Sequence, residues 1–166
     1  AQFRVKSTFS KFSQYGARSG KTADEVARDI LDRMQVPVKV EQVSGDLSDH
    51  YDPKDQILRL SDSTYGSESL AAIGVAAHEV GHALQHARGY FPLSLRTNIV
   101  PVANFGSWLG MPFFFIGFIF QSGMLVELGI LFFSFAVFFG LMTLPVEFNA
   151  SSRAIKILRE GRYLTE

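Results

Sequence analysis

The sequence contains no cysteine, which excludes disulfide bridges, thiolate metal sites and cysteine nucleophiles. It also lacks an excess of charge, because 16 lysines and arginines balance 16 aspartates and glutamates. A balanced charge argues against a strongly basic nucleic-acid-binding protein, so we expect no nucleic-acid partner. The length of 166 residues allows one compact domain.

Lysine and arginine are missing from residues 97–152, a region rich in phenylalanine. Two apolar stretches in it, 99–120 and 124–146, each have about the 20 residues that cross ~30 Å of hydrocarbon. The short polar segment between them predicts an antiparallel pair, so we expect a two-helix transmembrane hairpin over residues 97–146. The alternative is a buried helical pair in a soluble core, which a short chain has little other material to cover.

Basic residues flank this region on both outer sides and are missing from its turn. They are Arg88, Arg96, Arg153, Lys156, Arg159 and Arg162. The positive-inside rule therefore predicts a multi-pass protein of the cell membrane with both polar parts in the cytoplasm. The first 20 residues are basic and contain no acid, which fits contact with anionic lipid headgroups or a solvated tail.

The polar parts indicate a mainly α fold with a small β element. In the N-terminal part, 1–96, Thr22 and Glu25 form a capping-box pattern before a helix at 23–34. We expect strands or extended pieces at 36–40, 50–51 and 57–60, and a second helix at 67–87. In the C-terminal part, 147–166, residues 147–158 have a helical pattern. The two parts and the apolar hairpin would form one composite domain.

The helix expected at 67–87 contains the motif His78-Glu79-Val80-Gly81-His82. Four residues along a helix bring two imidazoles to one face, one turn apart, where they can hold a single ion. Glu79 is rotated by about 100° from His78, beside the ion, where it can act as the general base of a zinc hydrolase. The alternative is a helix with incidental polar histidines near a membrane surface.

A zinc hydrolase needs a third protein ligand and one open position. A metzincin is excluded, because Gln85 and Arg88 stand where that class requires glycine and histidine. Glu147 is the favoured third ligand, since the hairpin returns it to the level of the metal helix. Its alternative role is a cap or an ion pair with Arg153.

Two further residues lie one helical turn from the predicted ligands. Ser151, one turn after Glu147, is placed to bond a ligand from an outer layer. His86, one turn after His82, is a rival metal ligand, an outer-layer or cleft residue, or simply a histidine at a helix end.

The chain resembles the prokaryotic membrane zinc metallopeptidases of the YugP type in three separated segments. These are 78–86, 144–154 and 49–53 with 58–61. More distantly the chain is similar to the HtpX-type and CAAX prenyl proteases, in which a glutamate after a membrane hairpin completes the site. The resemblance implies a gluzincin-like metallopeptidase domain interrupted by a transmembrane hairpin, with one Zn²⁺ per chain. In the wider group an aspartate usually follows the glutamate by one turn, where this chain has Ser151. Such proteins usually carry further membrane helices at both ends.

The resemblance also implies roles around the substrate cleft. The strand at 57–60 would pair with an extended peptide by edge addition. His50 or Tyr51 would donate a hydrogen bond to the oxyanion of the reaction, or else stabilise a turn. Asn149 and His86 would lie around the metal ligands or in the substrate cleft.

These observations predict a membrane-embedded zinc endopeptidase. It would hydrolyse peptides or membrane proteins at the cytoplasmic face of the lipid bilayer, in membrane-protein quality control. One alternative is a non-catalytic scaffold in which four protein ligands surround zinc and staple the soluble helices to the hairpin. Another is a latent enzyme in which His50, His86 or a chain segment blocks the metal.

Overall fold

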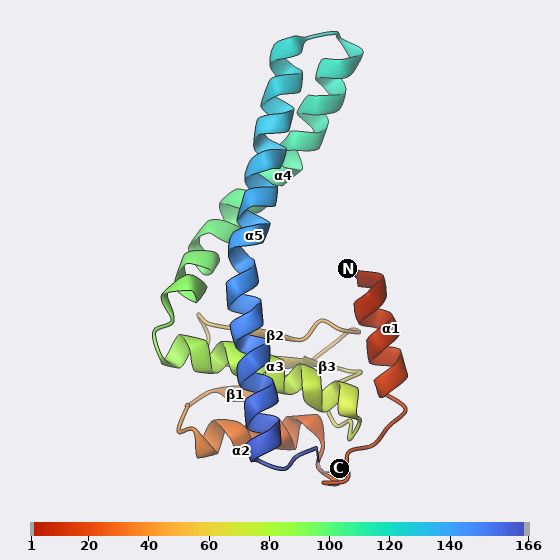
Figure 1. Ribbon diagram of the computed structural model, residues 1–166, viewed down its shortest axis with the longest axis vertical. Coiled ribbons are helices and arrows are strands. Elements are labelled where there is room, and N and C mark those ends of the chain that lie inside the picture. Colours follow the sequence, from red (N-terminus) through yellow and green to blue (C-terminus); the bar gives the residue numbers. More distant parts are fainter. Residues whose placement is uncertain (1, 165–166) are drawn as a thin grey trace. The chain divides into compact units, whose positions relative to one another are not determined.

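The computed structural model describes residues 2–164 (Figure 1). Residue 1 of the predicted 1–96 part and residues 165–166 of the predicted 147–166 part lie outside the described residues. The elements are α1 (Gln2–Phe12), α2 (Ala23–Arg33), β1 (Lys39–Val43), β2 (His50–Asp52), β3 (Ile57–Ser61), α3 (Leu70–Ala87), α4 (Phe91–Ile119) and α5 (Gly123–Glu160). The chain forms two compact units, the first made of Ala1–Gly89 with Phe148–Glu166 and the second of Tyr90–Glu147.

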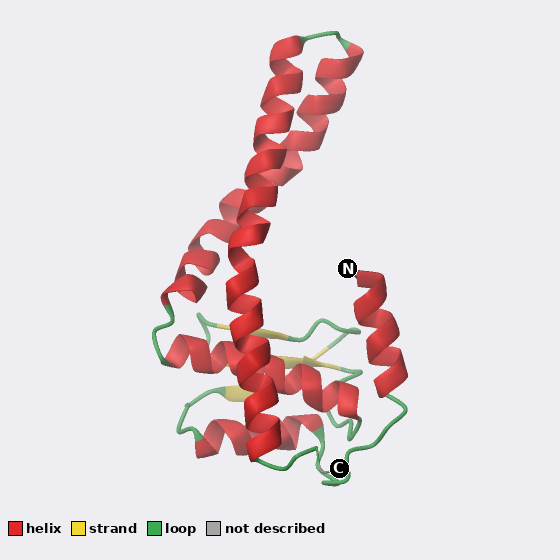
Figure 2. Ribbon diagram, in the orientation of Figure 1, coloured by secondary structure: helices red, strands yellow, loops and turns green. Residues whose placement is uncertain are grey.

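The fold is mainly helical with one small sheet, as the sequence predicts (Figure 2). The strand order is β1-β3-β2, with β1 parallel and β2 antiparallel to β3. The first strand begins three residues later than the predicted 36–40. The reason is that the Val36 N–H bonds to the Leu31 carbonyl at the end of α2, and Pro37 has no N–H to give to a ladder.

The sheet order corrects one expectation about substrate binding. The strand expected to receive a peptide along its edge, 57–60, is β3, which lies in the centre of the sheet. It pairs with β1 along its whole length, and its residues 57–59 also pair with β2 on the other side. Edge addition at 57–60 is therefore wrong, because β3 lies between two strands and is not an edge strand.

The core of the first unit lies where α2, α3, β3 and the end of α5 meet. Its buried members include Val26 and Ile30 of α2, Leu58 and Leu60 of β3, Ile73, Val80 and Leu84 of α3, and Ala154 and Leu158 of α5. The helical spacing of these residues on α2 and α3 produces one apolar face on each helix. At the start of α2 the predicted capping box is present, with the Thr22 N–H donating to Glu25 Oε2 at 3.0 Å.

The end of α5 crosses α3 (Figure 1). The two backbones come close at Gly81, the residue before His82. A Cβ atom on Gly81 would lie 2.7 Å from the Ala150 carbonyl oxygen. This is too close for any residue except glycine unless one helix moves. The motif helix and the helix that follows Glu147 are therefore fixed against each other by a backbone contact.

We expect Gly81→Ala to destabilise the protein by about 1–3 kcal/mol, because the added methyl group overpacks against backbone that cannot rotate away. The measurement is the denaturant midpoint of unfolding. Gly74→Ala is the matched control, since Gly74 lies on the same helix and a Cβ atom added there would meet nothing within 4 Å. There, alanine should stabilise the helix by up to about 1 kcal/mol. Equal midpoints for Gly81→Ala and the parent would contradict the close helix crossing.

The chain after α5 is tied back to α2 by Tyr163. Its hydroxyl donates to Asp29 Oδ2 at 2.6 Å, and the side chain is buried. Burial, together with the bond to the Asp29 carboxylate, raises the pKa of Tyr163 to about 12. This anchor and the Gly81 crossing hold the last turns of α5 at two points.

The second unit is a pair of helices, α4 and the first part of α5, with glycines at their contacts. Cβ atoms on Gly117 and Gly129 would lie 2.6 Å from the Val126 nitrogen and 2.5 Å from the Phe114 nitrogen, respectively. Within residues 2–164, α5 alone is long and apolar enough to cross a membrane, and 11% of its most apolar window is buried. The apolar stretch of α4, Ala103–Ile119, is shorter.

The helix expected to end at residue 146 and the helix expected at 147–158 are one continuous helix, α5. Pro145 lies inside it. A proline removes one backbone hydrogen bond, and here that loss does not end the helix. Glu147 therefore lies on the same continuous helix as the residues that cross α3.

Candidate metal site

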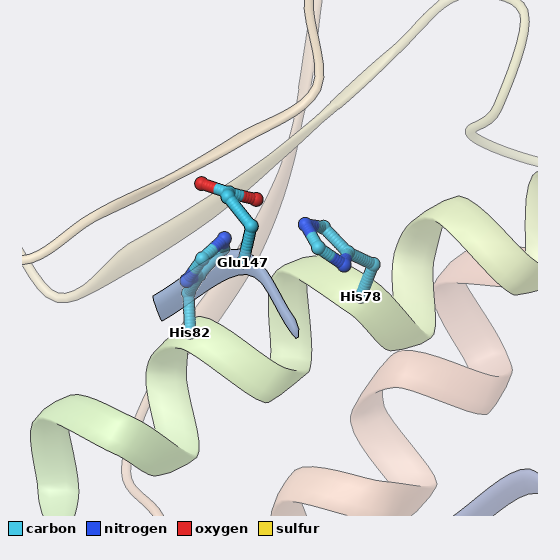
Figure 3. A group of neighbouring side chains, drawn as sticks. All are labelled: His78, His82 and Glu147. Atoms are coloured by element: carbon cyan, nitrogen blue, oxygen red, sulfur yellow. The ribbon is translucent and has the colours of Figure 1, made fainter. Parts of the chain in front are cut away.

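Three side chains with metal-binding groups meet beside α3. His78 and His82 lie one turn apart on this helix, with ring centroids 4.8 Å apart, and Glu147 lies on α5. One ligand atom from each lies within 4.8 Å of the others. Figure 3 shows both imidazoles and the carboxylate directed toward a common point. Glu147 is the last residue of the second unit, and α5 continues from it without a break into Phe148 of the first unit.

The donor set fits a zinc ion. Two imidazoles and one carboxylate form a three-ligand set found in zinc hydrolases, with bonds of about 2.0–2.2 Å. Ligand atoms bound at such distances lie within 4.8 Å of each other, as they do here. Among the described residues, the group has three members, whereas a structural zinc site is closed by four protein ligands.

Each of the three candidate ligands has an outer partner. Ser151 Oγ lies 3.1 Å from His78 Nδ1, and Gln85 Oε1 lies 3.0 Å from His82 Nδ1. Arg96 donates to Glu147 Oε1 at 2.5 Å. Partners of this kind orient metal ligands and fix the atoms that face the ion. Glu147 therefore forms an ion pair with Arg96. Arg153, the partner expected from the sequence, instead donates to Asn149 Oδ1.

Glu79 is held next to the two histidines by the backbone of β2. The Tyr51 N–H donates to Glu79 Oε2 at 3.0 Å. Burial raises the pKa of Glu79, and the nearby His82 and His78 and the Tyr51 hydrogen bond oppose this rise. A carboxyl group with a raised pKa, oriented by one fixed hydrogen bond, has the properties of a general base.

The remaining predicted residues fall into two groups. The Tyr51 hydroxyl lies 2.8 Å from His86 Nδ1, and Asn149 Oδ1 accepts from Gln85 Nε2 at 3.0 Å, so these residues surround the site. His50 lies on the exposed side of β2, where its Nδ1 is 2.8 Å from the Ser48 carbonyl oxygen. Burial raises the pKa of Tyr51, with Asp52 adding to the rise.

Sequence reasoning missed two residues of the site, Gln85 and Arg96. Gln85 is fully buried, and its signal was a polar residue three positions after His82 on the apolar face of the helix. Arg96 precedes Glu147 by 51 positions, and no sequence pattern pairs the two residues. Only the turn between α4 and α5 brings these positions together.

Comparisons with known proteins identify the family of this chain. Residues 1–166 match the family described as "Putative neutral zinc metallopeptidase". The "Putative membrane protease YugP" of Bacillus subtilis (strain 168) is 54% identical over 159 residues, which cover 95% of this chain and 71% of the relative. No solved structure matches. Because the family match spans the whole chain, and two histidines and a glutamate gather on α3 and α5, the chain belongs to the family described as "Putative neutral zinc metallopeptidase".

Proposed function

We propose that this protein is a membrane-embedded zinc endopeptidase of the gluzincin type, with one Zn²⁺ per chain held by His78, His82 and Glu147. The observation that carries the proposal is the meeting of these three side chains beside a glutamate fixed by the Tyr51 backbone. A scaffold with structural zinc has no use for such a glutamate. The three-member group also leaves one coordination position for solvent or substrate.

The chemistry follows from the positions of the side chains. Bound zinc supplies a Lewis acid that polarises a peptide carbonyl and lowers the pKa of water toward about 7. Glu79 accepts a proton from the attacking water and passes it to the leaving amine. The Tyr51 N–H holds one carboxylate oxygen of Glu79, which leaves the other oxygen for this proton transfer. Ser151, Gln85 and Arg96 keep the three ligands oriented.

We further propose that α4 and the first part of α5 cross the membrane as a hairpin. The exposure of their aromatic side chains supports this, because a helix pair in a soluble core is mostly buried. Trp108 and Phe118 are each more than 70% exposed. Arginines and lysines flank the pair on both sides and are missing from the turn, which supports a site on the cytoplasmic face. Substrates would then be peptides or membrane proteins reached from that side, as in quality control.

The test is cleavage of an unfolded protein such as casein by the purified chain in lipid nanodiscs. We expect cleavage with zinc bound, loss of cleavage after removal of zinc by a chelator, and recovery when one equivalent of zinc is returned. Cleavage that survives complete removal of the metal would contradict the proposal. So would stoichiometric zinc binding without cleavage of any unfolded substrate, which is the behaviour of a scaffold.

A further inference from the structure

We propose that Arg153, acting through Asn149 and Gln85, fixes the tautomer of His82 that presents the Nε2 lone pair to a metal ion. The inference rests on the proposed zinc site and concerns residues outside the ligand set. All four side chains belong to the first unit, with His82 and Gln85 on α3 and Asn149 and Arg153 on α5. They form a chain of hydrogen bonds in which each member restricts the next.

The direction of the chain is set at Arg153. Its Nε lies 2.7 Å from Asn149 Oδ1. A guanidinium group donates hydrogen bonds and has no acceptor, so the Asn149 side chain must turn its oxygen toward Arg153. This removes the usual ambiguity between the oxygen and the nitrogen of an amide side chain.

The same oxygen then orients Gln85. Gln85 Nε2 lies 3.0 Å from Asn149 Oδ1, and an amide oxygen only accepts, so Gln85 must present its NH₂ group there. Its own oxygen, Oε1, is thereby turned toward His82 Nδ1, at 3.0 Å. Because this oxygen also only accepts, His82 Nδ1 must carry a proton. In the neutral ring, Nε2 then keeps the lone pair that a metal ion requires.

Burial makes this choice strict. Gln85 is 0% exposed and His82 is 7% exposed, so water has little access to replace a missing bond. A flipped Gln85 amide would set its oxygen against the Asn149 oxygen, two acceptors with no proton between them, and its NH₂ group against His82 Nδ1. A buried unsatisfied amide costs about 1–3 kcal/mol. The outer partner of His78 differs in this respect. Ser151 offers a hydroxyl, which either donates or accepts and so selects no tautomer.

The experiment is long-range ¹H–¹⁵N NMR of the histidine rings in the metal-free full chain, with zinc affinity measured separately by chelator competition. Spectra are recorded at alkaline pH, after the ring signals have reached their neutral limit, and His82→Ala assigns the ring. We expect His82 of the parent to carry its proton on Nδ1. In Asn149→Leu the Nδ1–H form should lose its dominance, and zinc affinity should fall by about tenfold or more.

Asn149→Asp is the rescue variant, because a carboxylate still accepts from both Arg153 and Gln85. It should keep the Nδ1–H form and a zinc affinity near that of the parent, which a loss of packing alone would not explain. Arg153→Leu removes the outermost member of the hydrogen-bond chain and is a milder change. It should shift the tautomer of His82 in the same direction as Asn149→Leu. Ser151→Ala is the control and should leave the His82 tautomer unchanged.

Either of two results would overturn the inference: a parent His82 with its proton on Nε2, or an Asn149→Leu variant with unchanged tautomer and affinity. The proposed function fails separately. A parent that shows the Nδ1–H form and binds no zinc would support the hydrogen-bond chain and contradict the metalloenzyme.

Discussion

Glu79→Gln should bind zinc as the parent does and cleave peptides about 10²–10⁴ times more slowly, the range that a general acid–base group contributes. Glutamine has nearly the shape of glutamate and still accepts the Tyr51 N–H through its amide oxygen, as Glu79 does at 3.0 Å. It cannot take a proton from water. The measurement is the cleavage rate at saturating zinc, together with metal content after dialysis.

The control for this loss is Glu41→Gln, the same change at an exposed position on β1. It should cleave at the rate of the parent. A Glu79→Gln variant that cleaves as fast as Glu41→Gln would show that another group is the base. A variant that loses its zinc would place Glu79 among the ligands.

Loss of an outer partner of a metal ligand lowers metal affinity by about 10–100-fold. Glu147→Ala should lower zinc affinity by more than this. It removes one of the three ligands and leaves Arg96, whose guanidinium bonds to this carboxylate, as an uncompensated positive charge beside the ion. Cleavage at limiting zinc should be lost with the metal. Chelator competition measures the affinity directly, and unfolding in denaturant checks that the variant is folded.

Glu127→Ala is the matched control, since Glu127 lies on the same helix, 20 residues earlier. At 1.5 Å per residue this is about 30 Å along the axis, too far for a shared ion. We expect parental affinity. Equal losses in the two variants would mean that the acids act through the general charge of the helix and that neither is a specific ligand.

The parts of the site that the sequence predicts are those set by local geometry. His78, Glu79 and His82 lie within one turn of a helix, and the helical period alone places the imidazoles on one face. Thr22 and Glu25 likewise fix the start of α2 through a hydrogen bond between residues three positions apart. Such patterns need no knowledge of the rest of the fold.

The parts that the sequence misses depend on contacts between distant segments. Arg96 meets Glu147 only after the chain has turned back through α5, and the order of strands that makes β3 central is a tertiary property. Gln85 belongs to the site through Asn149, 64 positions later. The continuous α5 was missed for a different reason. Pro145 and the change from apolar to polar residues suggest a helix end, while packing at Gly81 and Tyr163 supports the later turns.

The most direct test of the central claim is the anomalous scattering of zinc in crystals of the metal-loaded chain. The account predicts one zinc peak at about 2.0–2.2 Å from a nitrogen of His78, a nitrogen of His82 and an oxygen of Glu147, with solvent in the remaining position. A zinc peak that lacks Glu147, or one whose fourth position is filled by His86 or another protein atom, would contradict it.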